Sequence, residues 1–200
     1  MTEHLTTYLE LMHEIKRRHI SADLAYDEPH RLMFKATTID FCYTNFRKIL
    51  ELVAFSVLSS NQTALRNSNR APSRDYHAEK VLKFIEKKFG PVYPIPITQV
   101  MDPRPGVKAD FVNIAEGYLT RSEFAKLYSE CGDVLHSRNP FRKPLDLDFY
   151  WPRVPYWSER IRALLNSHIA TIVDDPNLHL IQMGAGTDEP PYANTFAPLS

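Results

Sequence analysis

The chain has 200 residues and a mass of 23.1 kDa, enough for one domain whose apolar core needs neither disulfides nor a metal to hold it together. Its 24 Lys and Arg residues balance 24 Asp and Glu residues, which argues against a uniformly basic nucleic-acid binder and against an acidic, solvating chain. The apolar fraction of 44% is typical of a globular protein.

Cysteine usage and the absence of familiar motifs exclude several classes of protein. Cys42 and Cys131 lie far apart and outside any CxxC or Cys/His cluster, so we expect two reduced thiols and no metal site. The N-terminal segment lacks the pattern of a signal peptide, and no run approaches the roughly 18 apolar residues of a membrane span. GxGxxG, Walker A, GxSxG and HExxH motifs are absent. The sequence therefore predicts a soluble, cytoplasmic protein with no cofactor, no nucleotide and no membrane partner.

The first third of the chain is predicted to be helical. Of 15 prolines only Pro29 falls before Pro72, and proline is the residue that most strongly disfavours a helix. Apolar residues at three- and four-residue steps predict a first helix of about five turns, capped by Thr2. A second helix is predicted from Arg31 to Ser59, and because it is apolar on most sides it should be central.

The middle of the chain alternates between polar, helical and proline-rich segments. Residues 60–75 are polar and predict a loop, and a helix follows over 76–89, ending at Gly90. Five prolines between residues 91 and 105 favour extended structure, with a possible hairpin between 97–101 and 107–112.

The C-terminal half is predicted to contain two more helices. One begins at a cap at Thr120 and ends between residues 135 and 138, before Pro140. Residues 140–155 hold four prolines and should be irregular, and a last helix is expected over 156–173 with His168 as a core histidine. The predicted fold is therefore mainly α: a bundle of about five helices with one or two short β-hairpins and proline-rich extended connections. Residues 1–175 form the bundle, and residues 176–200 form an extended tail or hairpin of the same domain.

The most suggestive polar residues close the helix that begins at Thr120. Arg138 continues the apolar face of this helix, with His136 and Asn139 beside it. A buried arginine requires an anion, and Glu51 or Asp40 on the central helix are candidate partners. Two interpretations remain: a structural Arg–carboxylate pair, or a pocket for phosphate or RNA formed by His136, Arg138 and Asn139.

Arg47 and Glu51 form an i, i+4 pair on the flank of the central helix. As a surface ion pair it contributes only about 0.3–0.5 kcal/mol. Alternatively, Arg47 and Glu51 support a functional site at Arg138, which requires the pair to border the Arg138 pocket.

A helical bundle with a long central helix and a late helix that ends in an Arg-Asn turn resembles the HEPN superfamily. Its active members are metal-independent ribonucleases with an Arg-polar-x-His motif, and dimerisation brings two copies of the motif together. Arg138-Asn139 match the first two places, but no histidine follows, and His136 precedes the arginine. If the chain is an enzyme, the resemblance implies an endoribonuclease with a toxin or defence role, in which His136 acts as acid or base and Arg138 stabilises the phosphorane.

Basic residues gather in the middle of the chain, where residues 61–108 hold 9 bases and 4 acids, whereas residues 144–200 hold 3 bases and 7 acids. This cluster is either a solvated face or a contact for a polyanion such as RNA, an acidic protein or the acidic tail of a second copy. Its candidate polyanion-binding residues are Arg66, Arg70, Arg74, Lys80, Lys83 and Lys87.

Because the Arg-polar-x-His motif is not intact, the sequence favours a helical module without catalysis of its own. Such a module would act by protein–protein interaction or self-association, with another protein or a second copy of the chain as partner. The alternative is a HEPN-like metal-independent ribonuclease or RNA-binding protein.

Overall fold

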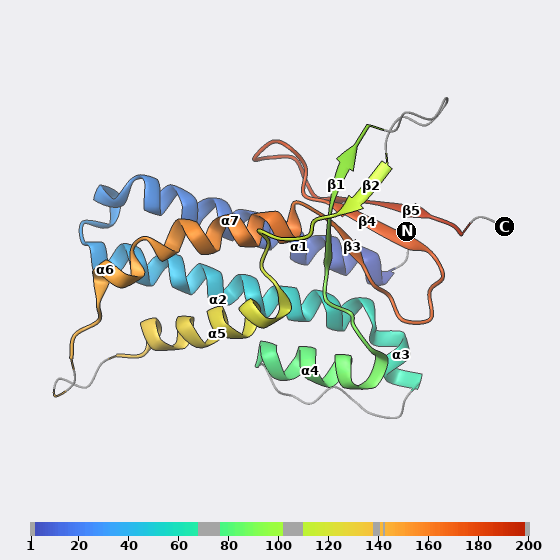
Figure 1. Cartoon of the computed structure of the whole chain (residues 1–200), viewed down its shortest axis with the longest axis horizontal. Coiled ribbons are helices and arrows are strands. Elements are labelled where there is room, and N and C mark those ends of the chain that lie inside the picture. Colours follow the sequence, from blue (N-terminus) through green and yellow to red (C-terminus); the bar gives the residue numbers. More distant parts are fainter. Residues whose placement is uncertain (1–2, 68–76, 102–109, 138–140, 142, 199–200) are drawn as a thin grey trace.

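The computed structural model of the chain describes residues 3–67, 77–101, 110–137, 141 and 143–198 (Figure 1). The helices are α1 (Glu3–Asp27), the 3-10 helix η1 (Pro29–Leu32), α2 (Lys35–Ser60), α3 (Gln62–Asn67), α4 (Ala78–Phe89), α5 (Arg121–Leu135), α6 (Leu147–Tyr150) and α7 (Arg153–Leu165). The strands are β1 (Ile95–Val100), β2 (Asp110–Asn113), β3 (Ser167–Ala170), β4 (Leu178–Gln182) and β5 (Tyr192–Phe196). The predicted mainly α class is confirmed.

Helix α2 is the centre of the bundle. It contacts α1, α4, α5 and α7, and it buries side chains on most of its circumference, as its sequence predicted (Figure 1). It begins at Lys35 instead of Arg31, because Pro29–Leu32 form the separate helix η1 and Met33 then adopts a φ of 63°. Helix α1 extends over 25 residues, about seven turns, and is longer than predicted.

The five strands form one antiparallel sheet in the order β2-β1-β3-β4-β5, placed at one end of the bundle (Figure 1). Strand β1 pairs with β3 only through Ile95 and Pro96, and its remaining residues pair with β2. The predicted hairpin is thus confirmed as β1–β2, although the connecting residues 102–109 lie outside the described part of the chain. The C-terminal tail forms the β4–β5 hairpin, and β3 joins the two hairpins into a single sheet.

The predicted last helix is wrong at its C-terminal end. Helix α7 ends at Leu165, and Ser167–Ala170 form strand β3 between β1 and β4. Leu164, His168 and Ile172 are spaced four residues apart, which places them on one side of a helix. In a strand, residues separated by an even number also share a face, so the same spacing is compatible with a strand. Pairing with two neighbouring strands decided between the alternatives.

Two segments predicted to be irregular contain short helices. Gln62–Asn67 form α3 within the predicted loop, and residues 68–76 of that loop lie outside the described residues. Leu147–Tyr150 form α6, capped by Asp146, whose carboxylate accepts a hydrogen bond from the backbone N–H of Phe149 at 3.0 Å. Helix α7 begins at Arg153 and tolerates Pro155 in its first turn, where backbone N–H groups have no partner within the helix.

Local sequence signals set the bounds of α4 and α5 correctly. Helix α4 ends at Gly90, which has a φ of 86° and so adopts a backbone conformation that suits glycine. Helix α5 begins with the predicted cap, in which the Thr120 side chain accepts from the N–H of Glu123 and the Glu123 carboxylate accepts from the N–H of Thr120. The predicted cap of α1, Thr2, lies outside the described residues.

Cys42 and Cys131 are both buried and unpaired, in agreement with the prediction of free thiols. Burial raises the pKa of the Cys42 thiol to about 12 and raises the pKa of Cys131 as well. Both residues therefore act as small apolar side chains of the core. Among the helices that the structure describes, none combines the length and the apolar composition that crossing a membrane requires.

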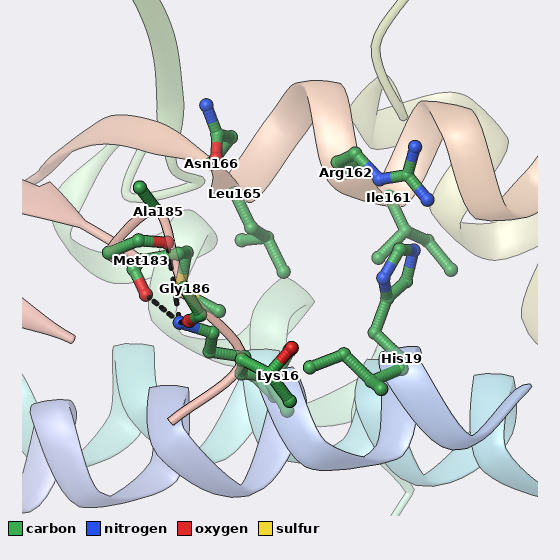
Figure 2. A pocket seen from close by; sticks show the side chains of 13 residues that line it. Lys16, His19, Ile161, Arg162, Leu165, Asn166, Met183, Ala185 and Gly186 are labelled. Carbon is green, nitrogen blue, oxygen red and sulfur yellow. Dashed lines mark hydrogen bonds between the residues drawn. The ribbon is translucent and has the colours of Figure 1, made fainter. Parts of the chain in front are cut away.

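A buried lysine attaches α1 to the loop that follows β4. Lys16 is only 8% exposed, and its ammonium group donates to the carbonyl oxygens of Met183 and Gly186 at 2.7 and 2.5 Å (Figure 2). It also donates to the carbonyl oxygen of Glu189 at 2.7 Å. The carbonyl oxygen of Gly184 lies 3.3 Å away. Since an ammonium has three N–H donors, the three short contacts satisfy it fully.

A buried carboxylate joins α2, α5 and α7. Glu130 on α5 accepts two hydrogen bonds of 2.5 Å from the Arg153 guanidinium, one of 2.8 Å from the Tyr43 hydroxyl and one of 3.2 Å from the Trp157 indole. Burial alone raises the pKa of Glu130, but the hydrogen bonds from Arg153, Tyr43 and Trp157 outweigh it and hold this pKa below its ordinary value. The carboxylate is therefore charged and fully partnered inside the bundle.

Glu130→Ala is expected to lower the free energy of unfolding by about 3–5 kcal/mol, because it leaves a partly buried guanidinium, a hydroxyl and an indole N–H without their acceptor. Glu14→Ala, which breaks the exposed ion pair with Arg18, should cost less than about 1 kcal/mol. Denaturant titration measures both values. Equal losses for the two variants would contradict this role of Glu130.

His168 is a core histidine, as predicted, although it lies in a strand. Its Nδ1 is 2.9 Å from the carbonyl oxygen of Leu165 and therefore carries the proton, while its Nε2 accepts from the Tyr8 hydroxyl at 2.8 Å. Both residues are almost completely buried. Burial lowers the pKa of His168 from 6.5 to about 4, so the folded state keeps the imidazole neutral.

The free energy of unfolding should fall as the pH is lowered from 6.5 towards about 4, because the unfolded chain binds a proton at His168 in this range and the folded chain does not. The full effect amounts to about 3 kcal/mol. Denaturation across this pH range should show a shallower dependence for His168→Gln than for the wild type. His30→Gln, at an exposed position of η1, serves as the control, and a slope unchanged in His168→Gln would contradict the assignment.

Candidate functional site

The structure describes only some of the candidate residues from the sequence. Arg138 and Asn139 lie outside the described part of the chain, as do Arg70 and Arg74, so the predicted Arg138 pocket is not tested. Arg66 is exposed at the end of α3. The described lysines of the basic cluster are exposed on α4, opposite its buried apolar side, and they are Lys80, Lys83 and Lys87.

An open hollow of about 580 Å³, the Arg47 hollow, lies between α2, the start of α4 and α5. It brings together two predicted site residues, Arg47 from α2 and His136 from the C-terminal cap of α5. Its lining is formed by Arg47, His77, Glu79, Ala125, Tyr128, Ser129, Gly132, Asp133 and His136.

Tyr128 holds two of the hollow's basic side chains. The Arg47 guanidinium lies over the Tyr128 ring at 4.8 Å from its centroid and donates to its hydroxyl at 3.3 Å. The His77 imidazole packs against the same ring, with 4.8 Å between the ring centroids. A cation over an aromatic face is attracted by the electron-rich ring, so Tyr128 positions Arg47 without neutralising its charge.

Gly132 lies beside Arg47 in the lining of the Arg47 hollow. It comes one turn after Tyr128 on α5, and a Cβ atom at this position would lie 4.0 Å from Nη1 of Arg47. This distance is an ordinary van der Waals contact, so the placement of the guanidinium does not depend on the glycine.

Glu79 and Glu51 are paired near the Arg47 hollow, whereas Asp133 lines it as an exposed carboxylate. Glu79 accepts from Arg121 at 2.7 Å and from Lys83 at 3.1 Å. Burial raises the pKa of Glu79, and the hydrogen bonds from Arg121 and Lys83 more than compensate and lower it. Glu51, the predicted supporting residue, pairs with Arg47 at 3.3 Å and with Lys48 at 3.0 Å.

The start of α4 adds a further positive contribution. His77 is the N-cap residue, and its side chain makes no capping hydrogen bond. The first backbone N–H groups of a helix have no partner within it and give this end a partial positive charge. Together with Arg47 and the ring nitrogens of His77 and His136, it gives the Arg47 hollow several hydrogen-bond donors for an anion, beside the carboxylate of Asp133.

Sequence reasoning identified Arg47, Glu51 and His136 but missed His77 and Tyr128. Tyr128 is only 6% exposed and lies among the buried residues of α5, so its position in the sequence favours a core residue. His77 lies at the junction between a polar segment and a helix, and no local pattern relates it to residues of α2 or α5. Only the packing of α4 against α2 and α5 brings these side chains together.

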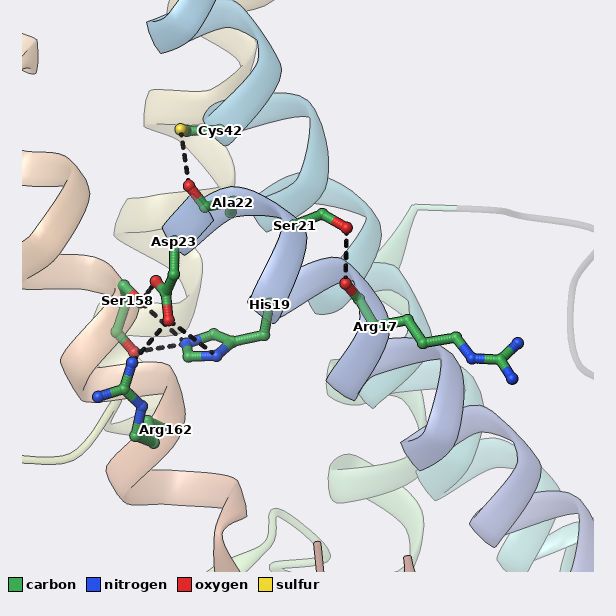
Figure 3. A network of polar contacts seen from close by, with 8 residues as sticks. All are labelled: Arg17, His19, Ser21, Ala22, Asp23, Cys42, Ser158 and Arg162. Atoms are coloured by element: carbon green, nitrogen blue, oxygen red, sulfur yellow. Dashed lines mark hydrogen bonds and ion pairs between the residues drawn. The ribbon is translucent and has the colours of Figure 1, made fainter. Parts of the chain in front are cut away.

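A second polar cluster contains a serine, a histidine and an aspartate, and joins α1 to α7 (Figure 3). His19 Nε2 lies 2.9 Å from Ser158 Oγ, and His19 Nδ1 lies 3.6 Å from Asp23. However, the Ser158 hydroxyl donates its single proton to Asp23, and His19 Nε2 also lies 3.0 Å from the Ser158 carbonyl, which can only accept. His19 Nε2 is therefore a donor and does not take a proton from the serine. The cluster is a structural connection and not a nucleophilic triad.

Metal binding finds no support in the described residues, which contain no group of three or more His, Cys, Asp or Glu side chains arranged to hold an ion. Comparison of the chain with models of known families, with curated proteins and with solved structures finds no match. The functional argument therefore depends on the geometry of the chain itself.

Proposed function

We propose that the chain binds RNA at the Arg47 hollow and cleaves its phosphodiester backbone without a metal ion. The observation that carries the proposal is that Arg47 and His77 both pack against the Tyr128 ring, in a hollow that His136 also lines. A guanidinium and two imidazoles from three different helical segments meet at one open surface. These are residue types that act as general acid, general base and charge stabiliser in active sites.

These groups can supply general acid–base catalysis, in which the phosphoryl group moves from the 5′-oxygen to the neighbouring 2′-oxygen of the RNA. The 2′-hydroxyl oxygen of RNA attacks the adjacent phosphorus while one imidazole accepts its proton. The bond from phosphorus to the 5′-oxygen breaks, and the second imidazole donates a proton to that leaving oxygen. Arg47 stabilises the negative charge that develops on the phosphoryl oxygens.

Histidine suits this reaction because it gains and loses a proton near neutral pH. Both histidines are exposed, so the RNA backbone can reach them from solvent. The exposed lysines of α4 begin one turn after His77 and extend the positive surface beyond the Arg47 hollow. Clustered lysines of this kind supply much of the sequence-independent affinity for nucleic acids.

Purified wild-type protein is expected to cleave mixed-sequence single-stranded RNA in the presence of EDTA. Because general acid–base catalysis contributes about 100-fold or more, His136→Asn and His77→Asn should each lower the cleavage rate by at least about that factor. Arg47→Gln should lower it by a comparable factor through the loss of charge stabilisation. Gel electrophoresis of end-labelled RNA measures the rates.

The matched control is His30→Asn, which changes an exposed histidine of η1 outside the Arg47 hollow and should cleave like the wild type. Thermal melts of all variants separate a loss of chemistry from a loss of folding. RNA left intact by the wild type, or cleaved normally by folded His136→Asn and Arg47→Gln variants, would exclude the proposed reaction.

A second candidate function is self-association, and the exposed apolar face of the sheet favours it. The sheet curls so that Phe111 of β2 contacts Phe196 of β5, with 6.3 Å between ring centroids, although these strands are its two edges. On the face that this contact partly closes, five large apolar side chains remain 39–47% exposed: Ile95, Phe111, Leu178, Tyr192 and Phe196. Large apolar side chains exposed on one face of a sheet are typical of protein interfaces.

If a second copy covers this face, the wild type should sediment as a dimer and Phe196→Ser should shift it to the monomer. Phe34→Ser removes an aromatic ring that is 63% exposed at the start of α2 and should leave the dimer intact. Sedimentation velocity at several concentrations provides the measurement. A wild type that remains monomeric up to high micromolar concentration would argue against self-association.

A further inference from the structure

A second hollow, of about 240 Å³, lies between α1, α7 and the loop that follows β4 (Figure 2). It shares no lining residue with the Arg47 hollow. Its apolar lining is formed by Ile15, Ile20, Ile161, Leu165 and Met183. We name it the α1–α7 hollow.

The loop wall of the α1–α7 hollow is held in place by its own hydrogen bonds. Lys16 binds the carbonyl oxygens of this loop, and the Glu189 carboxylate accepts from the backbone N–H of Ala185 at 2.8 Å. Gly184 has a φ of 76°, and a Cβ atom there would lie 3.0 Å from Glu189 Cβ. A loop fixed in this way makes the cavity largely preformed, which lowers the cost of binding a ligand.

One end of the α1–α7 hollow is polar. His19 and Arg162 lie together there, on α1 and α7 respectively (Figure 2). Arg162 donates from one terminal nitrogen to Asp23 at 2.6 Å, and its side chain is 57% exposed. A guanidinium has five N–H donors, and no other hydrogen bond of Arg162 is found among the described residues.

Both oxygens of the neighbouring Asp23 carboxylate already accept a hydrogen bond from the protein. One oxygen of Asp23 accepts from the Ser158 hydroxyl, and the other accepts from Arg162 (Figure 3). The guanidinium of Arg162 keeps N–H donors open at this end, so a ligand that meets it must bring an acceptor. A carboxylate matches the planar guanidinium and can accept two parallel hydrogen bonds from it.

We propose that the α1–α7 hollow binds a small carboxylic acid with an apolar body, its carboxylate on Arg162 and its body against the aliphatic walls. The size follows from the volume: a cavity of about 150 Å³ holds the six carbons of benzene, so 240 Å³ accommodates about eight to ten non-hydrogen atoms. A six-carbon carboxylate fits this number. The site is independent of the proposed RNA chemistry.

Titration of the ¹⁵N-labelled protein with hexanoate tests the site, with backbone amide shifts as the readout. The shifts should centre on Ala185, Gly186 and the C-terminal turn of α7. Hexanol lacks the charge and acetate lacks the apolar body, so each should bind about tenfold or more weakly than hexanoate.

Arg162→Gln should weaken hexanoate binding by about tenfold or more, while Arg18→Gln, which changes an arginine of α1 outside the α1–α7 hollow, should leave it unchanged. Ile20→Trp fills the hollow with Arg162 intact and should abolish binding. Thermal melts show whether each variant is folded. The proposal is overturned if hexanol binds as well as hexanoate, if the shifts lie elsewhere, or if folded Arg162→Gln binds normally.

Discussion

The buried carboxylate of Glu130 is the interaction on which the rest of the bundle depends. Its partners come from α2 and α7, so it fixes the rotation of α5 about its own axis. A helix turns by about 100° per residue, so Tyr128 and Gly132, each two residues from Glu130, lie almost on the opposite side of α5. Because Glu130 faces Arg153 and Trp157 of α7, Tyr128 and Gly132 face the Arg47 hollow. The geometry of the candidate site is in this way a consequence of a buried charge that lies outside it.

Polar connections of the same kind attach the C-terminal third of the chain to the first two helices. Tyr8 binds His168, Lys16 binds the loop after β4, and the Asn61 side chain binds the backbone around Val173. Among the described residues, no buried side-chain nitrogen or oxygen lacks a hydrogen-bond partner. Apolar packing alone tolerates small shifts between elements, whereas these directional bonds specify one placement of the sheet on the bundle.

The sequence predicted the elements whose signals are local. Helices α2, α4 and α5 followed from apolar periodicity, from Gly90 and from the cap at Thr120, all of which act within a few residues. The strand at Ser167–Ala170 was missed because its neighbours β1 and β4, not its own residues, decide its conformation. Arg47 and His136 were recognised separately, but their meeting with His77 depends on contacts between three helices, which no pattern along the chain encodes.

The position of Lys16 also has a consequence for the order in which the protein folds. Its acceptors lie up to 173 residues further along the chain, and the partner of Tyr8 lies 160 residues away. Contacts between such distant residues close large loops and form late. During synthesis from the N-terminus, α1 emerges long before the segment that satisfies its buried ammonium. The hydrogen bonds of Lys16 and Tyr8 therefore form only after this segment has left the ribosome, whereas α1 can already pack against α2, the helix that follows it in the chain.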